Sequence, residues 1–377
     1  QWALPDELLT RIELVADRLA PTNPTNLYQH LFSGREYELY DDEGNWEEQS
    51  KKLSDRRKVA IQEIFQQTGV EGVIRFAESV SNSFYVGYAL GDIDGEVFEH
   101  RLLPSFLDSV EGKHKTLAGG FIWRRYSLKG WQWCDEIDKS DWSPEQVGLF
   151  LTCLPFTKDA WDRASQWLES NEREYWNRTD ANAYQTEGDF AFAIDKLIEY
   201  GRPHAAIDCL ARMRHAQAEL DIAQCVRALL AAVTSSESSR SMDGYQIVEL
   251  IKYLQEEQSV NPDDLFRVEW AYVSLLDGYR GATPKHLENK LSTDPEFFCE
   301  LIRLIYRSKN EDQPLVETTD GAQAIATNAW RLLHEWKTPP GTRPDGGFSG
   351  DRFNEWLQRI KEICTESGHL EVALINV

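Results

Sequence analysis

The side chains best suited to hold a metal lie between residues 204 and 225. His204, Cys209, His215 and Cys225 are of the two residue types that bind zinc most often. Their spacings match no common zinc pattern, and residues five, six and ten apart do not share one face of a helix. We therefore predict no metal site, and we expect no cofactor.

A second set of reactive groups is the string GDIDGEV, which follows an apolar run and contains Asp92 and Asp94. It resembles the nucleophile loop of haloacid-dehalogenase-type phosphatases. That resemblance implies that Asp92 attacks phosphorus, that Asp94 is the acid and base, and that Mg²⁺ shields the charge. Gly91 and Glu96 depart from the family's pattern, and the alternating strands and helices of its fold are missing. A turn between helices explains both aspartates equally well.

Other strings only approximate known catalytic motifs. GKHKT, from Gly112, lacks the earlier glycine of a phosphate loop, and GFSGD around Ser349 is one residue too short for a nucleophile elbow. The acidic pairs Asp135-Glu136 and Asp263-Asp264 are adjacent in sequence, whereas glycosidase carboxylates face each other about 5–10 Å apart. A helical-toroid glycosidase stays open as an alternative, and we assign no catalytic residue.

Aromatic residues offer the clearest candidates for binding. The chain has 13 tryptophans, and most lie on the apolar stripe of a predicted helix, which favours a place in the core. The stretch WRRYSLKGWQW is glycine-flanked and locally basic in an acidic chain, so it is suited to docking an acidic or phosphorylated peptide. Trp161 is predicted to pack on a neighbouring helix. The predicted binding residues are Arg124, Arg125, Lys129, Trp131, Trp133 and Trp176.

The overall charge argues against nucleic acid. The 377 residues include 63 acidic and 40 basic side chains, giving a formal net charge of −23, which repels phosphate backbones. Six scattered cysteines suggest neither a disulfide framework nor a zinc module. No apolar run reaches the roughly 18–20 residues that span a bilayer. We expect no signal peptide, because the N-terminal residues lack a basic region followed by an apolar one. We therefore expect a soluble, cytoplasmic protein. The chain begins at Gln1 and ends in an apolar run, from which we expect a fragment of a longer polypeptide.

Helical periodicity positions these residues. Three segments repeat the same pattern, in which an apolar-striped helix ends at a glycine and another helix soon begins, at Gly69, Gly201 and Gly368. Such helical hairpins resemble the building blocks of the HEAT- and tetratricopeptide-like α-solenoid class. The intervals between the glycines are uneven, and the tetratricopeptide signature is absent. The resemblance implies a concave protein-binding surface and transfers no functional residues.

We predict an all-α fold, an irregular superhelical array of antiparallel hairpins. The aromatic-rich region 84–142 is the exception, because its glycines and partial alternation admit an irregular or strand-containing insert. The predicted divisions are an N-terminal region at 1–142, central hairpins at 143–233, a polar linker at 234–244 and C-terminal hairpins at 245–377.

The function predicted from these features is non-catalytic. We expect a protein–protein interaction scaffold, or the sensor or regulatory arm of a larger intracellular protein, with a protein or peptide partner and no membrane. The alternative is an enzyme on a helical scaffold, either the phosphatase using Asp92 and Asp94 or the glycosidase. The oligomeric state is not predicted.

Overall fold

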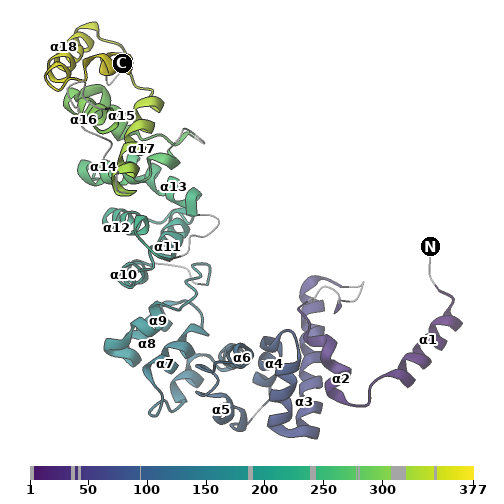
Figure 1. The fold of residues 1–377 in the computed structure, drawn as a ribbon. Helices are drawn as coiled ribbons and strands as arrows, with labels where there is room; N and C mark the ends of the chain where they lie inside the picture. The colour runs from purple at the N-terminus through teal and green to yellow at the C-terminus, as the bar shows by residue number, and fades with distance from the viewer. Residues whose placement is uncertain are drawn as a thin grey trace. The chain divides into compact units, whose positions relative to one another are not determined.

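The chain folds into helices throughout the part that the structure describes. This computed structural model describes residues 4–34, 39–40, 44–93, 95–185, 190–237, 243–276, 278, 281–306, 320–343 and 346–377. Every regular secondary-structure element in these ranges is an α-helix or a 3-10 helix (Figure 1). The one β-type contact there is an isolated bridge between Thr342 and Phe348. The all-α prediction is therefore confirmed. The chain divides into two compact units, Gln1–Thr186 and Glu187–Val377, here called unit 1 and unit 2.

Unit 1 is built around α3, α4 and α6. Its helices are α1 (Asp6–Leu19), α2 (Pro24–Tyr28), η1 (Gln29–Phe32), α3 (Trp46–Ser79), α4 (Ser83–Gly91), α5 (Val97–Leu102), α6 (Gly112–Glu136), α7 (Pro144–Thr152), α8 (Lys158–Leu168), η3 (Glu169–Asn171) and α9 (Arg173–Trp176). Glycines at positive φ interrupt the two longest helices, Gly69 in α3 and Gly130 in α6. Asn45 caps α3, and Ser143 forms a capping box with Gln146 at the start of α7.

The predicted irregular or strand-containing insert at 84–142 was wrong, because α4, α5, α6 and the junctions between them occupy it. Its glycines serve helix packing. A Cβ on Gly87 would lie 1.9 Å from the carbonyl oxygen of Leu117, and one on Gly120 would lie 2.1 Å from that of Phe84. The backbones of α4 and α6 therefore approach so closely that only glycine fits. In the sequence, glycines at such a helix contact look like the glycines that mark turns.

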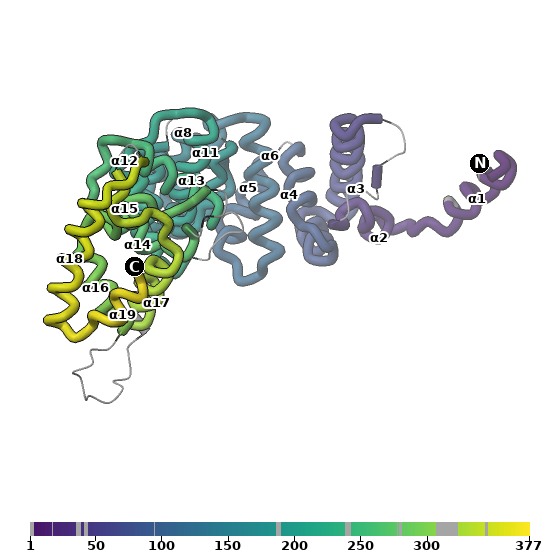
Figure 2. Tube along the Cα trace, turned by 90° about the horizontal axis from the view of Figure 1, so that it is seen from above, coloured from purple at the N-terminus to yellow at the C-terminus, as the bar shows by residue number. Residues whose placement is uncertain are grey.

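Unit 2 contains the helices from α10 onward, and those from α11 to α19 can be found by label in Figure 2. Its helices are α10 (Ala191–Glu199), α11 (Pro203–His215), α12 (Ile222–Val233), α13 (Asp243–Glu256), α14 (Pro262–Ala271), η4 (Val273–Leu275), α15 (Lys285–Thr293), α16 (Pro295–Ile305), α17 (Asp320–Glu335), α18 (Gly350–Glu366) and α19 (Leu370–Ile375). Gly201 and Gly368 adopt positive φ just after α10 and α18, as the hairpin pattern predicts. The core of the C-terminal half packs α16, α17 and α18 around Phe298 and Trp356.

The division between the units falls inside the central region predicted at 143–233. Of the predicted linker at 234–244, residues 238–242 lie outside the described residues. Asp243 already belongs to α13, and Glu237 accepts the backbone N–H of His204 at the start of α11. In the described part of this segment, Glu237 therefore caps the start of α11, and Asp243 is the first residue of α13.

Candidate functional site

Asp92, the proposed phosphatase nucleophile, is held in an ion pair. It caps the C-terminal end of α4, and its Oδ1 accepts a hydrogen bond from Nη2 of Arg124 at 2.6 Å. Only 9% of the Asp92 side chain is exposed. Arg124 also donates to the hydroxyl of Tyr88 at 3.0 Å. A phosphatase aspartate of that family follows a strand, whereas Asp92 follows a helix. Asp94 lies outside the described residues.

Two of the predicted binding residues anchor α5 to α6. Arg125 is 1% exposed and donates to the carbonyl oxygen of Ile93 at 2.8 Å. Trp133 is 4% exposed, and its Nε1 donates to Oε1 of Glu99 in α5 at 3.0 Å. The Nε atom of Arg125 lies 3.6 Å from the same carboxylate oxygen. Both side chains are therefore committed to the interior of unit 1.

Trp176 also lies in the core. It is fully buried, and its Nε1 donates to Oε2 of Glu172 at 3.1 Å. Its ring packs edge-on to Phe156, with centroids 6.3 Å apart. Trp161 is 1% exposed and packs at 5.0 Å on the same phenylalanine, which lies in the turn between α7 and α8. Its ring is therefore buried, and packing on a neighbouring helix stays a prediction.

Half-buried aromatic and cationic side chains gather between the C-terminal half of α6, the residues just after it, and α8. Trp131 packs edge-on to Tyr126 at 5.2 Å, and the guanidinium of Arg163 lies 4.3 Å from the centre of the Trp131 ring. Lys139 places its Nζ 4.2 Å from the centre of the Trp167 ring. We call these residues the Trp131 surface: Trp123, Tyr126, Trp131, Lys139, Arg163 and Trp167. The predicted residue Lys129 is exposed on the adjoining part of α6.

The cations of the Trp131 surface are already engaged within the chain. Arg163 donates to both carboxylate oxygens of Asp135, at 2.8 and 2.7 Å. That hydrogen bonding lowers the pKa of Asp135 and raises that of Arg163. Lys139 donates to the carbonyl oxygen of Ile137 at 2.9 Å, and burial lowers its pKa. The surface therefore presents aromatic rings whose neighbouring charges are largely compensated.

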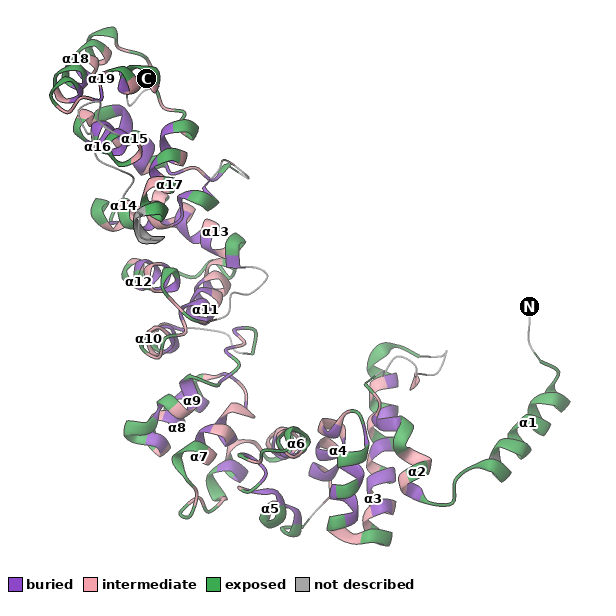
Figure 3. Cartoon of the chain, viewed as in Figure 1, coloured by how far each residue is buried: buried purple, intermediate pink, exposed green. Residues whose placement is uncertain are grey.

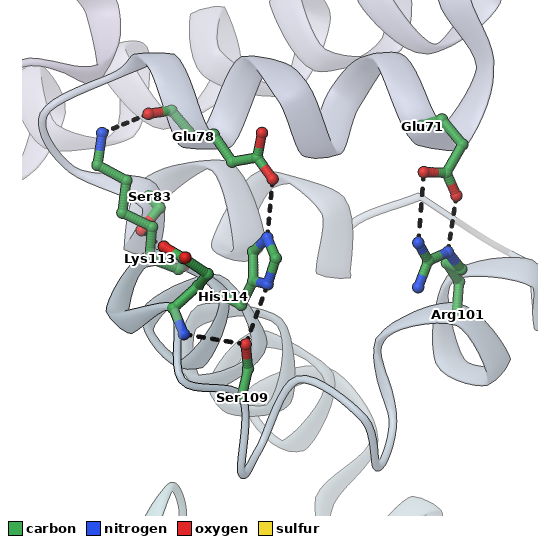
Figure 4. Close-up of polar contacts among 8 residues, drawn as sticks. Glu71, Glu78, Ser83, Arg101, Ser109, Lys113 and His114 are labelled. Atoms are coloured by element: carbon green, nitrogen blue, oxygen red, sulfur yellow. Dashed lines mark hydrogen bonds and ion pairs between the residues drawn. The ribbon is translucent and has the colours of Figure 1, made fainter.

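The structure brings together a hydroxyl, an imidazole and a carboxylate that sequence reasoning missed (Figure 4). Ser109 Oγ lies 3.2 Å from Nδ1 of His114, and Nε2 of His114 lies 2.8 Å from Oε1 of Glu78. This is the order of groups in a nucleophilic relay. Two of its members also hold the fold, because Ser109 accepts the N–H of Glu111 at 3.2 Å and His114 stacks on Phe106 at 4.2 Å.

Further contacts in Figure 4 tie the same elements together. Lys113 donates from Nζ to the backbone carbonyl of Glu78, and Ser83 donates to that of Lys113 at 3.0 Å. Arg101 in α5 forms two hydrogen bonds to Glu71 in α3, at 2.7 and 3.3 Å. The cluster thus clamps α3 to the starts of α4 and α6. No sequence motif marks this cluster, because His114 is 36 residues from Glu78 and Arg101 is 30 residues from Glu71.

The histidine and cysteine set shows no metal-binding arrangement in the described ranges. No group of three or more His, Cys, Asp or Glu residues there is placed to hold a metal ion. His204 is instead buried against Asp243, with Nδ1 2.9 Å from Oδ2. Burial raises the pKa of the Cys225 thiol to about 12, so that thiol stays protonated at neutral pH. Within the described residues, no helix is both long and apolar enough to cross a membrane.

Comparison with known proteins adds no relative. No protein-family model, no curated protein and no solved structure matches this chain. Function is therefore inferred from the chain's own geometry.

Proposed function

We propose that this chain is a non-catalytic helical-repeat scaffold, an α-solenoid of antiparallel hairpins, that binds a partner protein. It would serve as the scaffold or regulatory arm of a larger assembly. The observation that carries the proposal is a sequence separation of 28 to 36 residues that recurs between hydrogen-bonded residues from α2 to α13. In a stack of two-helix hairpins, each helix packs against the corresponding helix of the next hairpin. Contacting residues are therefore separated in sequence by about the length of one repeat.

Unit 1 supplies one series of these contacts. Hydrogen bonds between side chains join residues 28 to 36 positions apart from α2 to α9. The pairs are Tyr28 with Glu63, Arg101 with Glu71, His114 with Glu78, Arg124 with Asp92, Trp133 with Glu99, Arg163 with Asp135, and Arg178 with Glu145.

Unit 2 continues the series as far as α13, with separations of 32 and 33, whereas later contacts are further apart in sequence, such as 43 residues for Tyr272 with Leu229 and 63 for Arg359 with Glu296. Arg227 bonds to Asp195 at 2.6 Å, and Gln224 donates to the carbonyl oxygen of Ala191. The N–H of His204 donates to Glu237, and the hydroxyl of Tyr253 donates to the carbonyl oxygen of Leu220. A separation near 33 residues lies within the 20–45 residues typical of solenoid repeats. Similar separations from α2 to α13 support a repeat architecture in that part of the chain, despite the lack of a repeated sequence motif.

The Trp131 surface is the proposed binding site. Tryptophan and tyrosine rings bury a large area at low entropic cost, and they dominate binding energy at protein interfaces. The arginines that suggested an acidic partner are paired internally, Arg124 with Asp92 and Arg125 with carbonyl groups. The net charge of −23 attracts a cationic partner instead. We therefore propose a basic peptide segment that carries apolar or aromatic side chains.

Fluorescence anisotropy with two labelled synthetic peptides tests the proposed preference for a basic partner. The peptides have equal aromatic content, but one is rich in Lys and Arg and the other in Asp and Glu. We expect the basic peptide to bind, more weakly as salt increases, and Trp131→Ala to lower its affinity about tenfold or more. Trp330→Ala is the control, because Trp330 is 48% exposed but lies in unit 2. Equal loss in both variants, or binding of the acidic peptide alone, would contradict the proposed site.

The ion pair between Asp92 and Arg124 argues against the phosphatase alternative. Its nucleophile would have to leave a charged partner 2.6 Å away before attacking phosphorus. That ion pair favours a structural role for Asp92 at the α4–α6 contact, and we do not propose catalysis.

A further inference from the structure

The helix α1 carries an apolar face that its own chain leaves exposed. Leu8, Ile12, Val15 and Leu19 are spaced four, three and four residues apart, which places them on one stripe. Their exposed fractions are 43%, 51%, 53% and 77%. Figure 3 shows α1 coloured as exposed along its length. A helix of 14 residues is marginal in water without packing, so this stripe needs a partner surface.

An open apolar groove lies a few residues further along the chain, between α2, η1 and α3. Leu27, Tyr28, Leu31 and Val59 supply its apolar lining, and its volume is about 480 Å³. Val59 is 51% exposed there. His30, Asp55 and Arg56 form the polar part of the lining. The groove is therefore an apolar site with a charged border, the complement that an amphipathic helix requires.

The charges of the helix and the groove are complementary. The segment KKLSDRRK, residues 51–58 of α3, carries five basic side chains against one acidic. The helix α1 carries four acidic side chains against two basic. This basic segment stands out in a chain of net charge −23, and its Arg56 lines the groove. Attraction between the two segments therefore adds to the apolar contact.

The linker between α1 and α2 directs the helix away from its own groove. It contains Pro21 and is followed by Pro24, and a proline holds the residue before it in an extended conformation. Ala20 has ψ 134° and Asn23 has ψ 119°, so the chain does not reverse there. We propose that α1 docks instead into the groove of a second copy of this chain, in a reciprocal exchange of N-terminal helices.

The association is tested by light scattering coupled to size-exclusion chromatography on the 377-residue chain. We expect a mass twice the 43.4 kDa of one chain. Ile12→Asp removes the apolar stripe, Val59→Asp blocks the groove, and each should raise the dissociation constant about a hundredfold. Val97→Asp is the matched control, because Val97 is 50% exposed at the start of α5, outside both surfaces. Circular dichroism checks that each variant keeps its helices.

Mixing the two variants separates the exchange from other dimers. The Val59→Asp chain still has a sound α1, and the Ile12→Asp chain still has a sound groove, so their mixture should recover one of the two contacts and associate. A dimer formed by two α1 helices against each other would ignore Val59→Asp and would not recover on mixing. A monomeric wild-type chain at all concentrations overturns the proposal, as does dimerisation unaffected by Val59→Asp.

Discussion

The contact between α4 and α6 and the contact among α16, α17 and α18 solve the same packing problem in opposite ways. In unit 1, Gly87 and Gly120 remove side chains, so that the two backbones nearly touch. In unit 2, the ring of Phe298 fills the space between helices, with centroids 5.1 Å from Trp356 and 6.1 Å from Trp336. Helices can thus be packed together by removing side-chain volume, as at the α4–α6 contact (the glycine joint), or by adding it, as at the α16–α18 contact (the filled joint). A larger residue should disrupt the glycine joint, and a smaller residue should disrupt the filled joint.

The surroundings of the carboxylates, and therefore the direction of their pKa shifts, also differ between unit 1 and unit 2. In unit 1, Glu71 and Asp135 face arginines at the surface, and hydrogen bonding to those arginines lowers the pKa of each. In unit 2, burial raises the pKa of Glu269, which accepts the N–H groups of His286 and Leu287 at the start of α15. One residue type therefore secures helices by ion pairing in unit 1 and by capping a helix from the interior in unit 2.

The largest expected effect is at the filled joint. Phe298→Ala should lower the free energy of unfolding by about 3–5 kcal/mol, because it leaves a cavity among rings that cannot close on it. Urea unfolding followed by circular dichroism measures the loss, and hydrogen exchange should place it in α16–α18. Phe348→Ala is the control, since Phe348 is 60% exposed and its removal should change stability by less than about 0.5 kcal/mol. Equal effects would mean that Phe298 does not hold this joint.

The glycine joint should fail when volume is added. A Cβ at Gly120 would meet backbone atoms at 2.1 and 2.9 Å, so Gly120→Ala should cost about 1–3 kcal/mol. Its neighbour provides the matched control. A Cβ at Gly119 would meet only the Cys153 sulfur at 3.8 Å, so Gly119→Ala should stabilise the helix by about 0.5–1 kcal/mol. Thermal unfolding of the pair tests the sign, and a stabilising Gly120→Ala would contradict the close approach.

These two joints explain how far the sequence could predict the fold. Periodicity, caps and the glycines at 69, 201 and 368 predict helical hairpins, because each signal is local. The prediction for 84–142 was wrong because of glycines such as Gly87 and Gly120, since a glycine that admits a neighbouring helix looks the same in sequence as one in a turn. The repeat length was missed for a related reason. The repeat length that we propose rests on contacts such as Arg227 with Asp195, and not on recurring residue types.

The candidate site was predicted less well than the fold. WRRYSLKGWQW does mark the end of α6, and Trp131 lies on the resulting surface. Sequence alone could not tell that Arg125 and Trp133 turn inward, because Glu99, their common partner, lies on α5. Nor could it place Arg163, which reaches Trp131 from α8. Burial depends on the angle between helices, which a single helical wheel does not contain.

A pH titration sharpens the comparison of carboxylates. Glu269 has a pKa raised above its ordinary value of 4.5 by burial, so the folded state binds its proton more tightly than the unfolded chain. The associated stability is fully present below pH 4.5 and is lost as pH rises through the folded-state pKa. Glu269→Gln, which is neutral at every pH, should flatten this part of the stability curve measured by urea unfolding. An unchanged slope would assign the loss to another group, such as Glu288, whose pKa burial also raises.

The smallest expected effect has the opposite sign in pH and belongs to unit 1. Asp135 has a pKa lowered from 3.8 by its hydrogen bonds from Arg163, so its contribution is present above pH 3.8 and is lost as pH falls through the folded-state pKa. Its side chain is 47% exposed, so solvent screens the pair and Asp135→Asn should cost less than about 1 kcal/mol at neutral pH. The cost should shrink in high salt and vanish in acid, which urea unfolding across pH would show. A cost that persists in acid would mean that Asp135 acts by holding Arg163 over Trp131 through hydrogen bonds that survive protonation, and not through its charge.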